Sequence, residues 1–186
     1  MSHQSERLKH LEAQIDEIIE ASPAETREVV IALQTLRGVA KTTAVGLVSE
    51  IGNFSRFSNP GQLMMYVGVT PSEYSTGGPG KRRTGAITRM GNTHARCLVT
   101  ESAWNYRFQP SVNLRMKKAQ EQLDHELVAE ITQISWKAQN RLCARYRSLL
   151  ARGKTKQKTV TAVGRELLGF IWDIATSVEQ MQMARP

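Results

Sequence analysis

The sequence predicts an all-α fold. Apolar residues recur at three- and four-residue spacing along almost the whole chain, which is the period of an amphipathic helix, and alternating apolar and polar runs are absent. One long stretch, residues 68–92, interrupts this pattern with glycine, serine and basic residues. We therefore expect a helical domain with no sheet of consequence, a helical N-terminal arm, a helix-hairpin-helix-like motif and a long basic Gly/Ser loop.

The chain is strongly basic. Its 186 residues, 40% of them hydrophobic, suffice for one core and carry a formal net charge of +8. Because so much positive charge favours a polyanionic partner, we expect duplex DNA as the partner. No apolar run is long enough to span a membrane, and the first residues lack the charged-then-apolar pattern of a signal peptide. We expect a cytoplasmic protein with no membrane partner.

Metal-ligand patterns are missing from the sequence. Cys97 and Cys143 lie inside helical patterns, far from any Cys or His at metal-ligand spacing, and we expect buried, reduced thiols. Glu126, Glu130 and Asp173 are single acids on predicted helices. We therefore expect no metal site and no cofactor held by this chain.

Residues 1–28 form the predicted arm. Their apolar members lie at helical spacing among charged ones: Leu8, Leu11, Ile15, Ile18 and Ile19. Such an amphipathic helix must pack on something, either as a coiled coil or as a helix of the core. Ser22, Pro23 and Glu25 supply the cap and early proline of a second helix.

Residues 33–48 resemble a helix-hairpin-helix, in which one helix ends at a glycine turn and another begins within a few residues. Gly38 would form the turn, and the second helix would offer its first N–H groups, Lys41 and Thr42 to one phosphate. The usual hairpin has glycine where this chain has Ala40, so a positive φ there would be strained. A plain helical corner is the alternative.

The next helix boundary is marked by glycine and proline. Gly52 closes one helix, and Asn59-Pro60 begins another in the order cap then proline. Phe54 and Phe57, between these signals, are expected in the core because the chain has few other aromatic anchors.

The central stretch brings hydroxyls and cations together. Ser75 and Thr76 precede a glycine pair, and four cations follow: Lys81, Arg82, Arg83 and Arg89. A hydroxyl nucleophile beside fixed cations is what attack on a phosphodiester requires, because the cations stabilise the charge of the transition state. A basic surface loop that grips phosphates without chemistry is the alternative, since no base is visible nearby.

Beyond the loop, Asn92 is the predicted cap of a helix. From there the basic character continues: between residues 81 and 118, Glu101 is the single acid among nine cations, namely Lys81, Arg82, Arg83, Arg89, Arg96, Arg107, Arg115, Lys117 and Lys118. This asymmetry predicts nucleic-acid contact, with Arg89, Asn92 and Arg96 taking part. His94 either donates to a phosphate, takes part in proton transfer or is merely structural.

The last third of the chain reads as long helices. One runs from about Ser111 to Leu150, with a break expected near Asp124-His125, and a final helix follows Gly153-Lys154. Trp136, Phe170 and Trp172 are expected in the core.

The order of these motifs resembles the C-terminal domain of the insertion-sequence transposases of the "IS-one-ten" group, which are bridge-RNA-guided recombinases. The likeness spans about Val30 to Ala175. It rests on Leu36-Arg37-Gly38-Val39-Ala40 with Ala44, Glu50-Ile51-Gly52, Arg56-Phe57, Tyr66-Val67-Gly68-Val69-Thr70-Pro71, Ser75-Thr76-Gly77-Gly78, Ile87-Thr88-Arg89-Met90-Gly91-Asn92, Arg96 and Ala103-Trp104. The resemblance implies DNA transposition through a serine nucleophile, which forms a covalent phosphoserine link to DNA.

The resemblance also implies partners. A separate N-terminal RNase-H-like domain of the RuvC type would supply acids that bind Mg²⁺, and a guide (bridge) RNA would accompany duplex DNA. The chain begins with only the arm that normally follows that domain, so we expect a truncated or separately encoded half, acting as a homo-oligomer or as a hetero-oligomer with the RNase-H-like domain. We expect an arm at 1–28, the DNA-binding and catalytic domain at 29–178 and a tail at 179–186.

One departure affects the expected chemistry. The family serine stands immediately before glycine, where this chain has Thr76, so the nucleophile is either Ser75 or the Thr76 hydroxyl. Two hypotheses follow. The chain is a recombinase half that borrows acids from a partner, or it is a catalytically inactive DNA-binding remnant or accessory subunit that joins or inhibits a full-length transposase.

Overall fold

The computed structural model describes residues 3–74 and 83–185, and over these residues the all-α prediction is confirmed. The helices are α1 His3–Ala21, α2 Ala24–Leu33, α3 Lys41–Ile51, α4 Pro60–Val67, α5 Thr93–Ala103, the 3-10 helix η1 Trp104–Arg107, α6 Leu114–Glu121, α7 His125–Ala151 and α8 Lys156–Ala184. Two short strands, β1 Pro71–Tyr74 and β2 Arg83–Ile87, complete the described elements.

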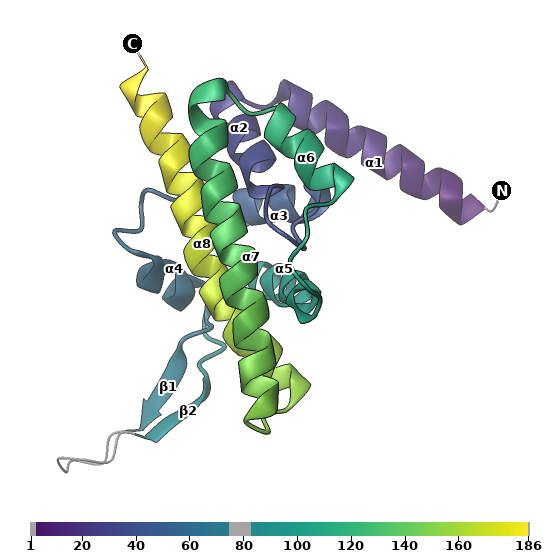
Figure 1. Cartoon of the computed structure of the whole chain (residues 1–186). Helices are drawn as coiled ribbons and strands as arrows, with labels where there is room; N and C mark the ends of the chain where they lie inside the picture. Colours follow the sequence, from purple (N-terminus) through teal and green to yellow (C-terminus); the bar gives the residue numbers. More distant parts are fainter. Residues whose placement is uncertain (1–2, 75–82, 186) are drawn as a thin grey trace.

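The core is built around α8. This helix lies beside α7, and α2, α4 and α5 also pack on it (Figure 1). Its apolar residues recur at helical spacing and are fully buried, among them Val163, Leu167 and Ile171. Gly164 faces α5, where a Cβ would be in ordinary van der Waals contact with the Val99 side chain at 3.4 Å. α8 therefore fixes the helices from which the candidate site is built.

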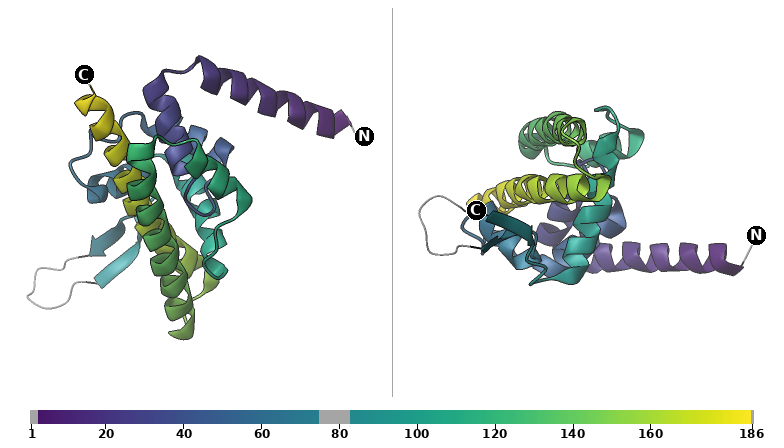
Figure 2. Two further views of the ribbon diagram at one scale, coloured as in Figure 1. Left: turned by 45° about the horizontal axis from the view of Figure 1, so that its top comes forward. Right: turned by 90° about the horizontal axis from the view of Figure 1, so that it is seen from below.

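α1 projects from this core as an arm, on the side opposite to the β-hairpin (Figures 1 and 2). Its apolar residues Leu8, Leu11 and Ile18 are exposed. Asp16 pairs with the ammonium group of Lys41 at 2.6 Å, which connects the arm to the start of α3. The prediction of a core helix, one of the two roles that the pattern of α1 allowed, is therefore wrong. Leu8, Leu11 and Ile18 are open to solvent.

β1 and β2 form an antiparallel hairpin that extends away from the helical body (Figure 1). Pro71 lies opposite Ile87 and Tyr74 lies opposite Arg83, with an irregularity between Pro71 and Glu73. The expectation of a loop through this whole stretch was wrong at these residues. The residue types of the two short strands do not alternate between apolar and polar, which is the sequence pattern that reveals a half-buried strand.

Most helix boundaries follow the signals in the sequence. The side chains of Asn59 and Asn92 cap α4 and α5 as predicted. The predicted break near Asp124 is confirmed, since α6 and α7 are separate helices on either side of it. One cap was wrong: the Ser22 hydroxyl donates to the carbonyl oxygen of Ile18 at 2.7 Å and makes no cap for α2.

The aromatic predictions are partly confirmed. Phe54 is fully buried, Phe57 nearly so, and the indole N–H of Trp172 donates to the Phe57 carbonyl oxygen at 3.1 Å. Trp136 is 46% exposed, so its placement in the core was wrong. It follows the buried Ser135, and each residue turns a helix by about 100°, which carries the indole off the packed face.

The two cysteines lie in different environments. Cys143 is buried as expected, and burial raises the pKa of its thiol. Cys97 is exposed on α5, so the prediction of burial was wrong for this residue.

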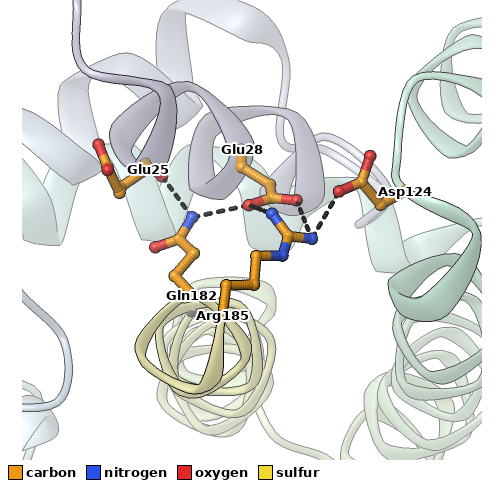
Figure 3. A network of polar contacts seen from close by, with 5 residues as sticks. All are labelled: Glu25, Glu28, Asp124, Gln182 and Arg185. Atoms are coloured by element: carbon orange, nitrogen blue, oxygen red, sulfur yellow. Dashed lines mark hydrogen bonds and ion pairs between the residues drawn. The ribbon is translucent and has the colours of Figure 1, made fainter.

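The C-terminal end of α8 is joined to α2 and to the α6–α7 junction by a polar network (Figure 3). The Arg185 guanidinium pairs with Glu28 at 3.4 Å and with Asp124 at 2.5 Å. The Gln182 side-chain amide donates to the Glu25 carbonyl oxygen at 3.0 Å and to the Glu28 carboxylate at 2.8 Å. Residues 179–184, expected as a tail, are part of α8.

Candidate nucleic-acid interface

The hairpin stands on a neck, which we define as the place where residues 66–68 meet residues 89–92. The N–H group of Arg89 donates to the carbonyl oxygen of Gly68 at 3.1 Å, which holds the two segments together. Arg89 is exposed and has a φ of 56°, the only positive φ outside glycine among the described residues. A non-glycine residue in this conformation is strained, and such strain is concentrated at functional sites.

Two glycines make the neck sterically possible. Gly68 ends α4 with a φ of 76°, and a Cβ there would lie 2.5 Å from the carbonyl oxygen of Met90. Gly91 has a φ of 137°, and a Cβ there would lie closer than 3.0 Å to the carbonyl oxygen of Tyr66. Only glycine fits either position, so the neck sets the direction in which the hairpin leaves the core.

Arg96 ties the neck to α5. Its guanidinium donates to the carbonyl oxygen of Val67 at 2.8 Å and to the hydroxyl of Thr93 at 3.0 Å. The side chain is half-buried between these acceptors. Its charge therefore adds to the positive potential of the neck, while its N–H groups are largely used within the protein.

Glu50, near the end of α3, bonds to the neck through both carboxylate oxygens. The Asn92 side-chain amide donates to one oxygen at 2.6 Å, and the ring Nδ1 of His94 lies 2.7 Å from the other. The bonds from Asn92 and His94 lower the pKa of Glu50 below its ordinary value of 4.5, so the carboxylate stays charged. Because Nδ1 is engaged, Nε2 is the nitrogen that the exposed His94 ring offers to a phosphate or a proton.

The ring of the neck residue Tyr66 packs on the ring of Phe57. The Tyr66 hydroxyl donates to the backbone carbonyl of Glu50 at 2.9 Å, and its ring centroid lies 5.5 Å from that of Phe57. The Arg56 guanidinium covers both rings, at 4.5 Å from Phe57 and 4.7 Å from Tyr66. Side-chain contacts from α3, α4 and α5 therefore meet at the neck.

The corner between α2 and α3 turns at Gly38, whose φ is 84°. A Cβ at Gly38 would collide with the carbonyl oxygen of Ser102, so this glycine lets the corner pack on α5. Ala40 is extended, with φ −84° and ψ 172°, and the strain expected there was wrong. The positive φ lies at Gly38, two residues before the position at which the usual helix-hairpin-helix has its glycine. Ala40 supplies no side-chain cap to α3.

A cavity of about 300 Å³ opens at the start of α3. It lies between the arm, the corner and α6, and its lining includes Glu12, Asp16, Lys41, Thr42 and Arg115. The Nε atom of Arg115 is buried and has no hydrogen-bond partner among the described groups, and burial lowers the pKa of this side chain. In this arrangement Asp16 of the arm neutralises Lys41, while Thr42 is exposed.

The predicted residues of the central loop are only partly placed. Ser75, Thr76, Lys81 and Arg82 lie outside the described residues. Arg83 opens β2. The Arg89 side chain is exposed at the neck.

The basic run predicted from the sequence is divided in space by α5. This helix has 11 residues, which span about 16 Å. Arg89 lies before its N-terminal end, whereas Arg107 follows its C-terminal end on η1 and Lys117 and Lys118 are exposed on α6. The run therefore forms two groups, one at the neck and one at the opposite end of α5.

Sequence reasoning missed two acids that bond to candidate site residues. Glu50 reaches Asn92 and His94 across more than 40 positions of sequence, and Asp16 reaches Lys41 from a different helix. No local motif signals either pairing. The only available hint was that both acids lie on predicted helices next to predicted sites.

Two further findings bear on the site. Within the described ranges, no three His, Cys, Asp or Glu side chains come together in a way that would hold a metal ion. None of the helices that the structure describes is long and apolar enough to cross a membrane.

The fold and the site define an α-helical domain that carries a β-hairpin on the neck at one end of α5 and a cationic α2–α3 corner at the other end. Residues 31–119, which include both features, match the model of the Transposase IS116/IS110/IS902 family. The resemblance noted in the sequence is confirmed.

A similar protein supports the same assignment. The chain is 46% identical over 152 residues to the protein named "Putative transposase y4qE" of Sinorhizobium fredii (strain NBRC 101917 / NGR234). The match covers 82% of this chain and 37% of that relative. The chain therefore spans little more than a third of the relative's length.

Proposed function

We propose that this chain is the DNA-binding part of a transposase and supplies the hydroxyl that attacks a DNA phosphodiester. The match of residues 31–119 to the transposase family carries the proposal. The nucleophile is Ser75, with Thr76 as the rival. Its oxygen bonds to phosphorus, the bond from phosphorus to a sugar oxygen breaks, and that sugar oxygen takes up a proton.

The other components come from partners. An RNase-H-like domain on another chain or segment would supply acids that hold Mg²⁺, and the chemistry supplied there would be stabilisation of charge on the phosphate. Duplex DNA is the substrate, and a guide RNA accompanies it. The complex is a homo-oligomer, or a hetero-oligomer with the acidic domain.

The geometry supports DNA contact at two places. At the neck, the exposed Arg89 and the Nε2 atom of His94 lie at the base of the hairpin that leads to Ser75. At the corner, the uncapped N–H groups of α3 together with Lys41 and Arg115 suit one phosphate. The corner takes a phosphate when the arm moves and Asp16 releases Lys41.

Binding is tested by replacing Lys81, Arg82 and Arg83 together with alanine. Salt-sensitive binding to duplex DNA with little sequence preference is expected, since these cations contact phosphates and release counterions. The triple variant should bind more weakly, with a flatter dependence on salt concentration. Unchanged affinity and slope would remove this loop from the interface.

Chemistry is tested by trapping the protein on a nicked DNA duplex with the acidic partner present. Ser75→Ala should abolish the covalent adduct and leave DNA binding nearly unchanged, because only the attacking oxygen is lost. Thr76→Ala is the matched rival, and its β-branched hydroxyl should be the poorer nucleophile. If Thr76→Ala alone abolishes the adduct, the residue assignment is wrong and the mechanism stands.

A DNA-binding accessory subunit without chemistry is the second candidate function. The observation that favours it is Thr76, which stands before Gly77 where the family has serine. In that case the wild-type chain binds DNA but forms no adduct even with the acidic partner, and it changes the activity of the full-length transposase by joining its complex.

A further inference from the structure

An exposed aromatic ring lies at the end of α5 opposite to the neck. Phe108 directly follows η1, and its side chain is 49% exposed. The Arg107 guanidinium carbon lies 4.5 Å from the centre of this ring, and that of Arg37 lies 5.8 Å from it. Two guanidinium groups therefore lie within cation–π distance of a ring that is half open to solvent.

The cations around the ring carry no compensating acids. Arg37 comes from the α2–α3 corner, Arg107 from η1 and Arg147 from α7, and none of the three forms an ion pair with a described residue. The Arg147 guanidinium instead donates to the Gln109 side-chain oxygen at 3.2 Å. Arg37 and Arg107 lie over the ring and Arg147 bonds to the residue after it, so three separate elements bring positive charge to this place.

Hydrogen bonds that involve the buried Gln139 hold this cluster in place. Arg37 donates to the Gln109 carbonyl oxygen at 2.6 Å and to the Ser111 hydroxyl at 3.2 Å. The side-chain oxygen of Gln139, a residue only 1% exposed, accepts from the Ser111 N–H group at 3.1 Å. The positions of Arg37 and of the segment after Phe108 are therefore set by the protein before any ligand binds.

We propose that Phe108, Arg37, Arg107 and Arg147 form a binding site for an unpaired nucleotide of a single-stranded nucleic acid. The base stacks on the Phe108 ring, and the exposed Arg107 and Arg147 guanidiniums hold the adjoining phosphates. Bases within a duplex are stacked on one another and offer no face to a side chain, so the ligand is an unpaired segment. RNA and DNA share this chemistry.

The site is distinct from the residues proposed to contact duplex DNA, because it uses none of the neck residues and neither Lys41 nor Arg115 of the corner. The test measures the affinity of the 186-residue chain for labelled oligo(dT), oligo(rU) and a duplex by fluorescence anisotropy. Phe108→Leu keeps an apolar side chain and removes the aromatic face. It should weaken single-strand binding about fivefold to a hundredfold, as the loss of one stacked base does, with duplex affinity unchanged.

Trp136→Leu is the matched control. This aromatic side chain is 46% exposed on α7, and among the described residues no guanidinium lies over it. Its replacement should change neither affinity. Phe108→Tyr keeps the ring and should retain single-strand binding. Arg107→Ala should weaken single-strand binding and flatten its salt dependence, which Phe108→Leu should not do.

The outcomes separate clearly. Preferential loss with oligo(rU) identifies RNA as the ligand, and preferential loss with oligo(dT) identifies single-stranded DNA. Equal losses on single strands and duplex, or unchanged single-strand binding in Phe108→Leu, would overturn the proposal. A wild-type chain that binds duplex but neither single strand would overturn it while leaving the proposed function intact. A chain that binds single strands but no duplex would contradict the proposed function and leave this proposal intact.

Discussion

Two helices of this protein end on glycines with nearly the same φ. α4 ends at Gly68, with a φ of 76°, and α7 is followed by Gly153, with a φ of 75°. A Cβ at Gly68 would lie 2.5 Å from the carbonyl oxygen of Met90, whereas a Cβ at Gly153 would meet nothing within 4 Å. At the α7–α8 turn glycine therefore serves backbone conformation alone, while at the neck it also lets two chain segments cross.

The helices that begin after these two places show the same contrast. Asn92 caps α5 by accepting from the Ala95 N–H group at 2.9 Å, and its amide also donates to Glu50 at 2.6 Å. Thr155 caps α8 by accepting from the Lys158 N–H group at 3.4 Å. The signal in the sequence is alike in both cases. At the neck, however, the cap joins three helices, and the contacts that shape the candidate site are tertiary.

The largest expected effect comes from alanine at the two glycines. Gly153→Ala should cost about 1 to 2 kcal/mol in free energy of unfolding, which is the penalty of a left-handed conformation for an L residue. Gly68→Ala should cost at least about 3 kcal/mol, because the same penalty is joined by a clash with a backbone carbonyl. Urea denaturation measures both. Equal costs would mean that the neck relaxes, and that its crossing does not fix the hairpin.

The helix caps give the second comparison. Thr155→Ala should cost about 1 kcal/mol or less, because one long capping bond is lost. Asn92→Ala removes a shorter capping bond and the bond to Glu50, so its cost should exceed that of Thr155→Ala. Thermal denaturation of the two variants measures the difference. Similar costs would show that the Glu50 bond contributes nothing to stability.

Much of this structure was readable from the sequence because it is local. A cap such as Asn92, a terminating glycine such as Gly52 and the break at Asp124 each depend on a few neighbouring residues. The apolar period likewise gave the buried face of α8, where Val163, Leu167 and related residues pack. These features follow from the chain within one or two helical turns.

The rest depends on residues that meet only in the folded chain. The bond of Glu50 to His94 joins two helices, and the exposure of Trp136 depends on which side of α7 the other helices cover. The hairpin escaped prediction because β1 and β2 are short and their residue types do not alternate between apolar and polar. The candidate nucleophiles Ser75 and Thr76 were predicted from the resemblance, and no motif in the sequence indicated the cluster around Phe108.

The third prediction is that the free energy of unfolding depends on pH through the neck. The α7–α8 turn should not contribute, because residues 152–158 contain no acid. Hydrogen bonds from Asn92 and His94 lower the pKa of Glu50 in the folded protein. The unfolded chain therefore binds the proton more readily, so the stabilising effect is complete above the ordinary pKa of 4.5 and is lost as the pH falls through the lowered value.

Urea denaturation at a series of pH values tests this with Glu50→Gln. The wild type should be more stable than the variant above pH 4.5, and the difference should shrink as the pH falls further. Asn92→Ala should reduce the pH dependence, and Thr155→Ala should leave it unchanged. A difference between wild type and Glu50→Gln that does not vary with pH would contradict the role assigned to this carboxylate.

The smallest expected effect lies at the α7–α8 turn, where exposed cations surround the start of α8. Lys156 is the first residue of α8, and a positive charge there opposes the helix dipole. Lys156→Glu should therefore stabilise the protein by about 0.5 kcal/mol at low salt, a rise of about 1 to 2 °C in Tm.

Lys118→Glu, in the last turn of α6, reverses the geometry and should lower Tm by a similar amount, about 1 to 2 °C. Because these effects are screened charge interactions, high salt should remove both. A change in Tm for Lys156→Glu that persists in high salt would indicate a specific contact of this side chain. The α7–α8 turn would then, like the neck, be held by side-chain contacts, although a Cβ at Gly153 meets nothing within 4 Å.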